Sequence, residues 1–508
     1  MNHDSPPEGT LGGPPPDPQD APPILDAIAD ASLRALAHRM LDDMLDYQLR
    51  IRERPVWQPM QPQDRATLHL APPAEAADLT AVYEHFRQHI LPFTVGNVHP
   101  GFMGWVHGGG TVVGMLADML AAGLNANCGG RDHAPILVEQ QVVEWARQWF
   151  GFPAGSSGLF VTGSSMANFI AVLVARRAAL GADVRSGGLD GAMHGLPGLV
   201  AYTSAAAHSC IARAMDYAGL GSSNLRIIPV DGGQRMDLTA LRTAIEADRG
   251  AGGAPFMLIG TAGSVDTGAI DDLAALADLA AAQRLWFHVD AAFGGLGILA
   301  PEIAPRLTGI ERADSLALDF HKWMQVPYDA GFVLVRDGVL HRDTFATSAP
   351  YLKRATRGIG AGEFWPNDFG PDLSRGFRAL KVWMTLRTYG TRQLGRMMAR
   401  CCRVARHLQS RVLAEPRLEL LAPVPLNIVC FRYRGSGPDT GADTAAGTDA
   451  LNEAIAADVQ ESGIAAPSTT RIGGRIAIRA AIFNHRTREH DVDALVQAVL
   501  AAGARRCA

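Results

Sequence analysis

The chain has 508 residues, of which 47% are hydrophobic and 19% charged, a composition typical of a globular protein with two or three domains. Its formal net charge is −5 and no basic block occurs along it, which argues against nucleic acid and anionic membranes as partners. No apolar run reaches the ~18 residues that a bilayer span requires, so we expect a soluble, cytoplasmic protein.

The first part of the chain combines a polar tail with helical patterns. Residues 1–24 are rich in proline, glycine and aspartate and lack the apolar segment of a signal peptide, so we expect a disordered tail. Apolar residues at three-or-four spacing predict helices over 24–54, 77–90, 113–124 and 135–150, with a loop over 92–110. The six cysteines form no CxxC pair, and their spacing indicates neither zinc nor a disulfide framework, so no metal site is expected.

Short apolar strands alternate with helices from residue 159 onward. Helices are predicted between several of the strands, notably over 237–247 and 271–282. The alternation predicts an α/β fold with a mostly parallel sheet that is covered by helices on both faces. The predicted strands are 159–161, 199–203, 226–229, 257–260, 285–289, 315–318 and 331–335.

The last third of the chain begins with an aperiodic stretch. Residues 341–372 hold several glycines, prolines and arginines, and a loop of that length in a compact enzyme is usually functional or disordered. An amphipathic helix is predicted over 373–389. Residues 395–508 show helix, strand, helix, strand and helix in turn, which predicts a small α+β domain with strands at 427–431 and 475–479.

Two residues at predicted strand ends carry the strongest chemical signal. Asp290 ends the apolar strand 285–289, and Lys322 follows the strand 315–318 within His321-Lys322-Trp323. Open α/β sheets bind ligands outside the carboxyl ends of their strands. A lysine that forms an imine and a carboxylate that pairs with a pyridine nitrogen are the groups that pyridoxal phosphate requires. Taken singly, Asp290 is also typical of a helix cap, and Lys322 of a surface lysine.

Two weaker signals lie earlier in the same block. Residues 162–165, with Ser164 and Ser165, stand between a strand and a helix, where backbone N–H groups and hydroxyls can hold a phosphate ester. A simple helix cap would have the same sequence. His208 follows the strand 199–203, where an imidazole can stack on a cofactor ring or be a buried, hydrogen-bonded histidine. No GxxxxGK[ST] motif occurs, so a nucleoside triphosphate is not favoured.

Taken together, these motifs resemble the group II pyridoxal phosphate-dependent decarboxylases, the family of aromatic-L-amino-acid, histidine and glutamate decarboxylases. The resemblance covers about residues 28–500, and HVDAA followed by DxHKW is its most specific part. The stretches that carry it are LPFTVGNVHPGFMGW (91–105), GSSMAN (163–168), AHSC (207–210), GTAGSVDTGAID (260–271), HVDAAFGG (288–295), ADSLALDFHKW (313–323), PYLK (350–353) and FRALKVW (377–383).

This resemblance implies the fold-type I architecture and a division of the chain. The expected parts are a disordered tail (1–24), an N-terminal helical extension that wraps a partner subunit (25–110), a large domain that binds pyridoxal phosphate (111–392) and a small C-terminal α+β domain (393–508). Enzymes of this family are usually homodimers with active sites at the dimer interface, so a homodimer is expected.

The resemblance also assigns the residues that would hold the cofactor. Lys322 is similar to the imine lysine and Asp290 to the partner of the pyridine nitrogen. His208 and Ala292 are expected on opposite faces of the ring. The remaining expected cofactor contacts are the phosphate ligands Ser164 and Ser165, the lining residues Asp319 and His321, and Ala262, which stands where many relatives have a hydroxyl residue.

Further residues are similar to those that bind substrate or close the site. Phe102 and Trp105 fall where relatives place the pocket for the substrate side chain, and Gly108 stands where some relatives have a threonine. Tyr351 is similar to a tyrosine on a mobile loop that helps to protonate Cα after CO2 leaves, with His208 as a second candidate. Glycines 358, 360 and 362 would let that loop move as a lid.

The expected function is decarboxylation of an L-amino acid, with an aromatic side chain favoured by Trp105 and Phe102. Alternatives on the same scaffold are an oxygen-consuming aromatic aldehyde synthase and a decarboxylase of glutamate or another acidic amino acid. Relatives that make aldehydes tend to lose the loop tyrosine or the stacking histidine, whereas Tyr351 and His208 are both present. An aminotransferase or lyase, or a homologue that only binds the cofactor, is less consistent with the full set of motifs.

Overall fold

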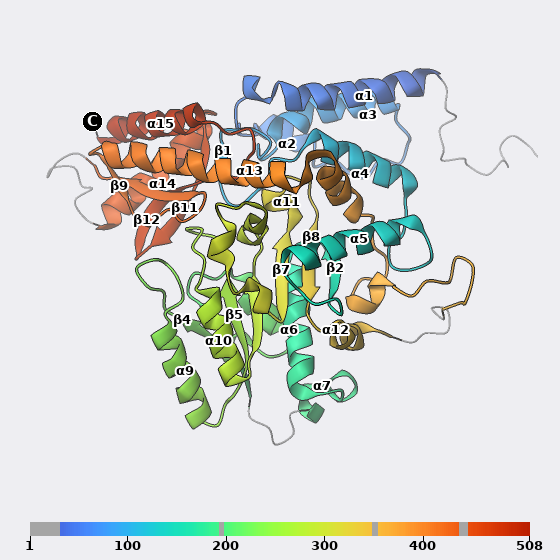
Figure 1. Ribbon diagram of the computed structural model, residues 1–508. Helices are drawn as coiled ribbons and strands as arrows, with labels where there is room; N and C mark the ends of the chain where they lie inside the picture. Colours follow the sequence, from blue (N-terminus) through green and yellow to red (C-terminus); the bar gives the residue numbers. More distant parts are fainter. Residues whose placement is uncertain (1–30, 193–197, 348–353, 436–444, 508) are drawn as a thin grey trace, which may run out of the picture.

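The computed structural model describes residues 31–192, 198–347, 354–435 and 445–507 (Figure 1). The expected tail and Tyr351 lie outside these residues. Two N-terminal helices lie along the top of Figure 1, where the phenol of Tyr83 donates to Asp43 at 2.8 Å and joins them. The helices of this part are α1 (Ala31–Leu49), α2 (Pro62–Ala66), α3 (Leu79–His89), α4 (Val112–Leu124) and α5 (Ala134–Trp149).

The sequence prediction missed α2, and the boundaries of the other four helices agree with it to within a few residues, for local reasons. The side chain of Asp78 accepts a hydrogen bond from the N–H of Thr80 at 2.8 Å and so caps the first turn of α3. Pro135 occupies the first turn of α5, where its missing N–H has no cost. The predicted helix over 24–54 is observed as α1 followed by a single 3-10 turn, and its first seven residues lie outside the described part.

A seven-stranded sheet forms the centre of the molecule and confirms the α/β prediction. Its order is β2-β8-β7-β6-β5-β3-β4, and only β8 runs antiparallel to its neighbours. All seven predicted strands are present, and most extend one to three residues beyond the predicted ends. They are β2 (Ser157–Val161), β3 (Leu199–Ser204), β4 (Leu225–Ile228), β5 (Ala254–Thr261), β6 (Trp286–Asp290), β7 (Ser315–Asp319) and β8 (Gly331–Val335).

Helices cover both faces of this sheet, as the alternation predicts. In β5, Met257 packs with Ile211 on the face covered by α6 and α8, whereas Leu258 packs with Leu276 of α10 on the other. Among the described residues no single helix is long and apolar enough to cross a membrane, and α6 with α7 passes that test only as a pair bent by 85°. The helices are α6 (Ser164–Leu180), α7 (Val184–Ala192), α8 (Cys210–Tyr217), α9 (Leu238–Gly250), α10 (Leu273–Gln283), α11 (Phe320–Trp323) and α12 (Gly338–Phe345).

The predicted aperiodic stretch 341–372 is partly ordered into helix. α12 continues to Phe345, and a 3-10 helix spans Pro366–Phe369. The helix predicted over 373–389 starts later, as α13 (Ala379–Ala414), and runs on through a kink at Gly390, where φ is 67°. The proposed boundary after residue 392 therefore falls inside α13, two residues beyond this kink. Figure 1 shows α13 extending from the large sheet to the C-terminal elements.

A second sheet gathers the C-terminal strands and one short strand from the N-terminal part. Its order is β1-β11-β12-β10-β9, and β1 (Phe102–Met103) pairs in parallel with β11. The sequence prediction missed β1, β9 and β11, and it placed residues 102 and 103 in a loop. The other elements are β9 (Leu418–Leu420), β10 (Ile428–Tyr433), β11 (Ala466–Ile472), β12 (Arg475–Ala481), α14 (Ala445–Glu461) and α15 (Glu489–Cys507).

Candidate active site

Five strands of the large sheet end around one cavity of about 440 Å³. β3 and β6 both run parallel to β5, β7 runs parallel to β6, and β2 has the direction of β7 because β8 is antiparallel to both. Their carboxyl ends therefore meet at one edge, as expected for a ligand site in an open α/β sheet. Nine of the residues singled out from the sequence line this cavity: Trp105, Ser164, Ser165, His208, Asp290, Ala292, Asp319, His321 and Lys322.

Lys322 lies in α11, the single helical turn that follows β7. Its Nζ is 2.7 Å from Oδ2 of Asp319, the last residue of that strand. Burial lowers the pKa of Lys322, but the carboxylates of Asp319 and Asp290 more than offset this, so the pKa lies above its ordinary value. Burial raises the pKa of Asp319, but Lys322 and His321 outweigh it and hold this pKa below its usual range. Both groups are therefore charged at neutral pH.

Asp290 ends β6 and is held by amide donors. Its Oδ1 accepts from the N–H of Ala292 at 3.1 Å and its Oδ2 from the side-chain amide of Asn168 at 3.3 Å. Oδ1 of Asn168 lies 2.7 Å from Nε2 of His288, whose Nδ1 lies 2.8 Å from Oγ of Ser315. Burial raises the pKa of Asp290. A buried carboxylate is most stable beside a cation, and a protonated pyridine nitrogen is such a partner.

Ser164 and Ser165 begin α6 directly after β2. A Cβ at Gly331 would lie 2.3 Å from Cα of Gly163, so a glycine at position 331 lets the loop before α6 pack on β8. The backbone N–H of Ser164 donates to Oδ1 of Asp319 at 2.7 Å, while both serines line the cavity. The positive end of the α6 dipole favours an anion at this place, as the predicted phosphate site requires.

The two predicted histidines of the site are neutral at neutral pH. Burial lowers the pKa of His208, and Nδ1 of this ring accepts a hydrogen bond from the N–H of Cys210 at 3.2 Å. Burial also lowers the pKa of His321 to about 4, and its Nδ1 accepts from the N–H of Ala330 at 2.9 Å. In each neutral ring the hydrogen is therefore on Nε2, and that of His321 lies 3.6 Å from Oδ1 of Asp319.

Ala262 does not line the cavity, although the sequence placed it among the cofactor contacts. It is fully buried in the hydrophobic core, and its N–H donates to the carbonyl of Asp290 at 2.9 Å. Its neighbours Thr261 and Gly263 line the cavity instead. Oγ1 of Thr261 is buried and has no hydrogen-bond partner among the described residues. Because an unpaired buried hydroxyl is costly, a polar ligand group in this cavity would satisfy it.

Of the three predicted substrate contacts, only Trp105 lines the cavity, with 53% of its surface exposed. Phe102 is buried behind it, with the two ring centroids 6.2 Å apart. Gly108 packs on the backbone of His321 and Lys322. A Cβ at position 108 would lie 2.3 Å from the carbonyl oxygen of His321 and 2.5 Å from that of Lys322. A threonine would therefore not fit at position 108 unless this backbone moved.

Sequence reasoning missed Asn168, which supports Asp290 without lining the cavity, and several residues of the cavity wall. Asn168 lies one helical turn after Ser164 on α6, so helical spacing would have placed it on the same face. Tyr328 comes from the loop between α11 and β8 and carries no signal in the sequence. Tyr351 lies outside the described residues, so its expected role stays a prediction. Thr162 and Gly163, which belong to the predicted phosphate segment 162–165, also line the cavity. The other lining residues that were not singled out are Val106, His107, Cys210, Thr261, Gly263, Val265 and Phe293.

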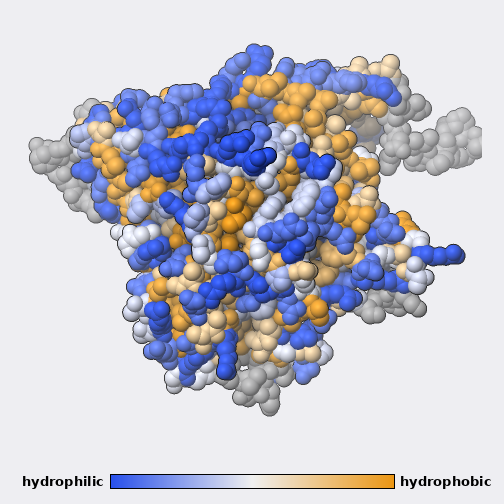
Figure 2. All heavy atoms as spheres, viewed as in Figure 1, coloured by the Kyte–Doolittle hydropathy of each residue, from blue (hydrophilic) through white to orange (hydrophobic). Residues whose placement is uncertain are grey.

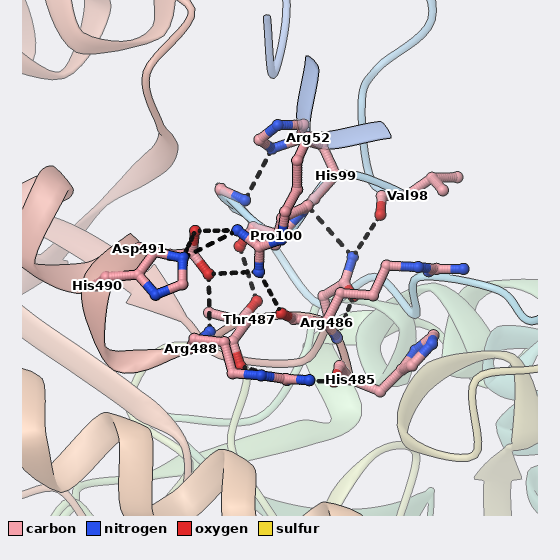
Figure 3. Close-up of polar contacts among 12 residues, drawn as sticks. Arg52, Val98, His99, Pro100, His485, Arg486, Thr487, Arg488, His490 and Asp491 are labelled. Carbon is pink, nitrogen blue, oxygen red and sulfur yellow. Dashed lines mark hydrogen bonds and ion pairs between the residues drawn. The ribbon is translucent and has the colours of Figure 1, made fainter. Parts of the chain in front are cut away.

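A polar network joins the loop that carries Trp105 to the segment between β12 and α15 (Figure 3). The hydroxyl of Thr487 donates to the carbonyl of Pro100 at 2.7 Å. Arg52 forms an ion pair with Asp491 at 2.8 Å and donates to the carbonyl of Arg486 at 2.7 Å, as the dashed lines of Figure 3 show. The N-terminal and C-terminal parts of the chain are thereby fixed to each other beside the cavity.

Gln325 joins the same segment to the turn that carries Lys322, and Arg486 joins it to the glycine run 108–110. Gln325 accepts from the N–H of Gly109 at 2.8 Å and donates to the carbonyl of Phe483 at 2.8 Å. Arg486 donates to the carbonyls of Gly109 and Gly110, both at 3.1 Å. Gly109 adjoins Gly108, which packs on the backbone of Lys322, so the glycine run is held both by the turn of Lys322 and by the segment before α15.

The residues present fit pyridoxal phosphate. Lys322 supplies an amine, Asp290 a buried carboxylate for the pyridine nitrogen, the start of α6 an anion site, and Thr261 an unpaired hydroxyl. These groups come from four separate elements and line one cavity. Its volume of about 440 Å³ is within the range of pockets that bind cofactors and small molecules.

Comparison with known proteins supports the same conclusion. The family model described as the pyridoxal-dependent decarboxylase conserved domain matches residues 62–434. The chain is 30% identical over 476 residues to an aromatic-L-amino-acid decarboxylase of Bacillus atrophaeus, with 92% of this chain and 94% of the relative covered. It is 30% identical over 483 residues to a phenylacetaldehyde synthase of Arabidopsis thaliana, with 92% and 95% covered.

The architecture also has a solved counterpart. The crystal structure of Oryza sativa TDC with PLP and tryptamine is similar at a TM-score of 0.86 and 27% identity, with 95% of this chain and 100% of that chain covered. The fold-type I prediction and the pyridoxal phosphate prediction are thus confirmed. The chain belongs to the pyridoxal-dependent decarboxylases, and it is a carboxy-lyase that uses pyridoxal phosphate.

Proposed function

We propose that this enzyme converts an aromatic L-amino acid into the corresponding amine and CO2, with Lys322 as the residue that bonds to the cofactor. The observation that carries the proposal is that Lys322, Asp290 and the serines at the start of α6 line one cavity. The names of the relatives in Bacillus atrophaeus and Oryza sativa support the aromatic substrate.

The residues of the site have distinct tasks in this proposal. Pyridoxal phosphate, when bound, supplies an electron sink for the bond that breaks at Cα. Asp290 keeps the pyridine nitrogen protonated, because a buried carboxylate favours a cation next to it. Asp319 holds the Lys322 amine in position through their 2.7 Å contact. His208 is neutral and lies at the cavity wall, where its Nε2–H can donate a hydrogen bond that orients a group in the cavity.

The lining of the cavity favours an aromatic side chain over an acidic one. Trp105, His107, Phe293 and Tyr328 contribute rings to the wall. Among the described residues that line the cavity there is no arginine, and the only lysine is Lys322. A distal carboxylate would need a cation for its desolvated charge, whereas an aromatic ring gains from packing on these rings. A glutamate decarboxylase is therefore the less favoured alternative.

An oxidative aldehyde synthase is the second candidate, because the Arabidopsis relative is named phenylacetaldehyde synthase. His208 is present at the cavity, and Tyr351 is present in the sequence, and both favour plain decarboxylation. The two reactions differ in their products. Peroxide and ammonia released together with CO2 would favour the synthase, whereas a stable amine without oxygen consumption supports the decarboxylase.

We also propose that the enzyme is cytoplasmic and that the chain divides into the four parts given above, 1–24, 25–110, 111–392 and 393–508.

We further propose that the enzyme is a homodimer. Apolar side chains are exposed on the N-terminal helices, among them Val82, Met119, Leu120 and Leu124. Figure 2 shows hydrophobic residues gathered at the surface over α3 and α4. Exposed apolar surface of this kind marks a protein–protein interface. Sedimentation at twice the mass of one chain supports the dimer, and sedimentation at the mass of one chain contradicts it.

The experiment that tests the function is a panel of the twenty L-amino acids incubated with the cofactor-loaded enzyme, with detection of CO2 and of the amine. CO2 and amine from aromatic amino acids only would agree with the proposal. Release from glutamate or aspartate instead would replace the substrate class, and a keto acid without CO2 would replace the reaction.

A further inference from the structure

Two polar rings in the wall of the cavity lack a hydrogen-bond partner. Neither the imidazole of His107 nor the phenol of Tyr328 makes a hydrogen bond to any residue in the described part of the chain. Their ring centroids are 5.7 Å apart, with the rings nearly edge to face. The ring of His107 also lies 5.7 Å from that of Phe102 and 6.1 Å from that of Trp105. Two unpaired polar groups are thus set within an otherwise aromatic cluster.

This cluster lies close to the reactive lysine. The Tyr328 ring centroid is 4.4 Å from that of His321, the residue before Lys322. Partial burial and the carboxylate of Asp319 raise the pKa of Tyr328, so its phenol is protonated at neutral pH, and with 48% of the residue exposed it is free to donate a hydrogen bond to a ligand. Burial, together with the charge of Lys322, lowers the pKa of His107, so its ring is neutral and has one nitrogen that can accept.

We propose that His107 and Tyr328 form a subsite for a hydroxyl on the substrate ring, so that the enzyme prefers phenolic amino acids such as tyrosine. The proposal rests on the proposed function and names the substrate class within it. A phenolic hydroxyl both donates and accepts, and it therefore matches one acceptor on His107 and one donor on Tyr328. An indole N–H only donates, and a phenyl ring would leave both groups unpaired.

The first test uses the unchanged, cofactor-loaded enzyme. We compare kcat/KM for L-tyrosine, L-phenylalanine, L-tryptophan and O-methyl-L-tyrosine, in which the hydroxyl can no longer donate. We expect L-tyrosine to exceed each of the others by up to about tenfold, the change that a net hydrogen-bond contribution of ~1.4 kcal/mol produces. This series needs no variant, so its result does not depend on how a substituted protein folds.

The second test removes each polar group without removing the ring. Tyr328→Phe and His107→Phe should each bring the tyrosine-to-phenylalanine ratio of kcat/KM closer to one, because activity on tyrosine falls more than activity on phenylalanine. Tyr217→Phe is the matched control, since this exposed tyrosine at the end of α8 does not line the cavity. In this control the ratio should stay at its original value.

A binding measurement gives a readout that does not depend on turnover. The methyl esters of tyrosine and phenylalanine have no free carboxylate to lose, and their binding changes the absorbance of the bound cofactor. We expect the tyrosine ester to bind about tenfold more tightly, and Tyr328→Phe to reduce this difference.

The outcomes separate the two proposals. Comparable kcat/KM for tyrosine and phenylalanine, or a ratio that neither variant changes, would overturn the hydroxyl subsite while the decarboxylase function stands. A preference for tryptophan over tyrosine would also overturn it. If no aromatic amino acid yields CO2, the proposed function fails, and the subsite fails with it.

Discussion

The ammonium of Lys322 and the carboxylate of Asp319 lie 2.7 Å apart. Asp319 is the last residue of β7 and Lys322 lies in α11, so this ion pair connects the strand to the helical turn that follows it. Asp319 also accepts from the N–H of Ser164 at 2.7 Å, so the lysine is tied to the start of α6. Two separate segments of the sequence are thereby fixed around one amine. The predictions that follow concern this amine, its surroundings and the segments that hold it.

The chain contains only three lysines, Lys322, Lys353 and Lys381, which makes the attachment site easy to identify. Reduction of the cofactor-loaded enzyme with borohydride should fix the cofactor on the peptide that contains Lys322, as read by mass spectrometry. Lys322→Ala should abolish turnover and leave no covalent label, because no other lysine lines the cavity in the described structure. A label on Lys353 or Lys381 would contradict the assignment.

Replacing Asp319 by asparagine should shift the pH dependence of cofactor attachment. The carboxylate holds the pKa of Lys322 above its ordinary value, so its loss lowers that pKa and raises the fraction of free amine at neutral pH. Because only the free amine reacts with an aldehyde, the rate of attachment should reach half of its maximum at a lower pH in Asp319→Asn. Asparagine can still accept from Ser164, which keeps the local structure comparable. An unchanged pH profile would show that the ion pair does not control the lysine.

Asp290→Asn should lower kcat by about a hundredfold or more, the usual cost of removing one preorganised charge from an active site. The amide cannot keep a pyridine nitrogen protonated, although it retains the shape of the side chain. Asp314→Asn is a matched control, because Asp314 also accepts a backbone N–H, that of Phe287 at 2.8 Å, but does not line the cavity. Equal losses of kcat in the two variants would mean that Asp290 acts only through the stability of the sheet.

The strands and the reactive pair could be predicted because their signals are local. β8 was predicted to the residue since Gly331–Val335 is an unbroken apolar run between polar segments. Asp290 and Lys322 were found because each follows such a run. β1 was missed because its two residues become a strand only by pairing with β11, more than 360 residues later in the chain. Short strands of this kind have no periodicity of their own.

The rest of the cavity depends on contacts that the sequence does not display. Tyr328 reaches the wall from a loop, and its position is set by packing on His321. Thr261 is the last residue of β5, and Ala262 follows it directly. Because successive side chains of a strand point to opposite faces, Thr261 lines the cavity and Ala262 does not. A resemblance assigns a role to a position, but it does not give the direction in which a side chain points.

Arg486 should act on substrate binding from outside the cavity. Arg486→Met removes the hydrogen bonds to the carbonyls of Gly109 and Gly110 and leaves them without these donors, at a cost of ~1–3 kcal/mol in stability. Because these glycines continue from the loop of Trp105, KM should rise by more than kcat falls. Arg488→Met is the control, since Arg488 donates to His485 and Thr487 within its own segment. A loss of stability with KM unchanged would make Arg486 a purely structural residue.

His341 should make the enzyme less stable in mild acid. It is fully buried, its Nδ1 lies 2.8 Å from Oγ of Ser157, and burial lowers its pKa to about 3. The same side chain in the unfolded chain titrates near ~6.5, so between these values the unfolded state binds one more proton. The contribution of His341 to the free energy of unfolding is therefore complete above pH ~6.5 and decreases as the pH falls. Between pH 7 and pH 5 the free energy of unfolding decreases by about 2 kcal/mol through this residue. Between pH 7 and pH 5, the midpoint temperature of thermal unfolding should fall less in His341→Leu than in the unchanged enzyme. In His69→Leu, a change at an exposed site, it should fall as much as in the unchanged enzyme. The same decrease in all three proteins would contradict the prediction.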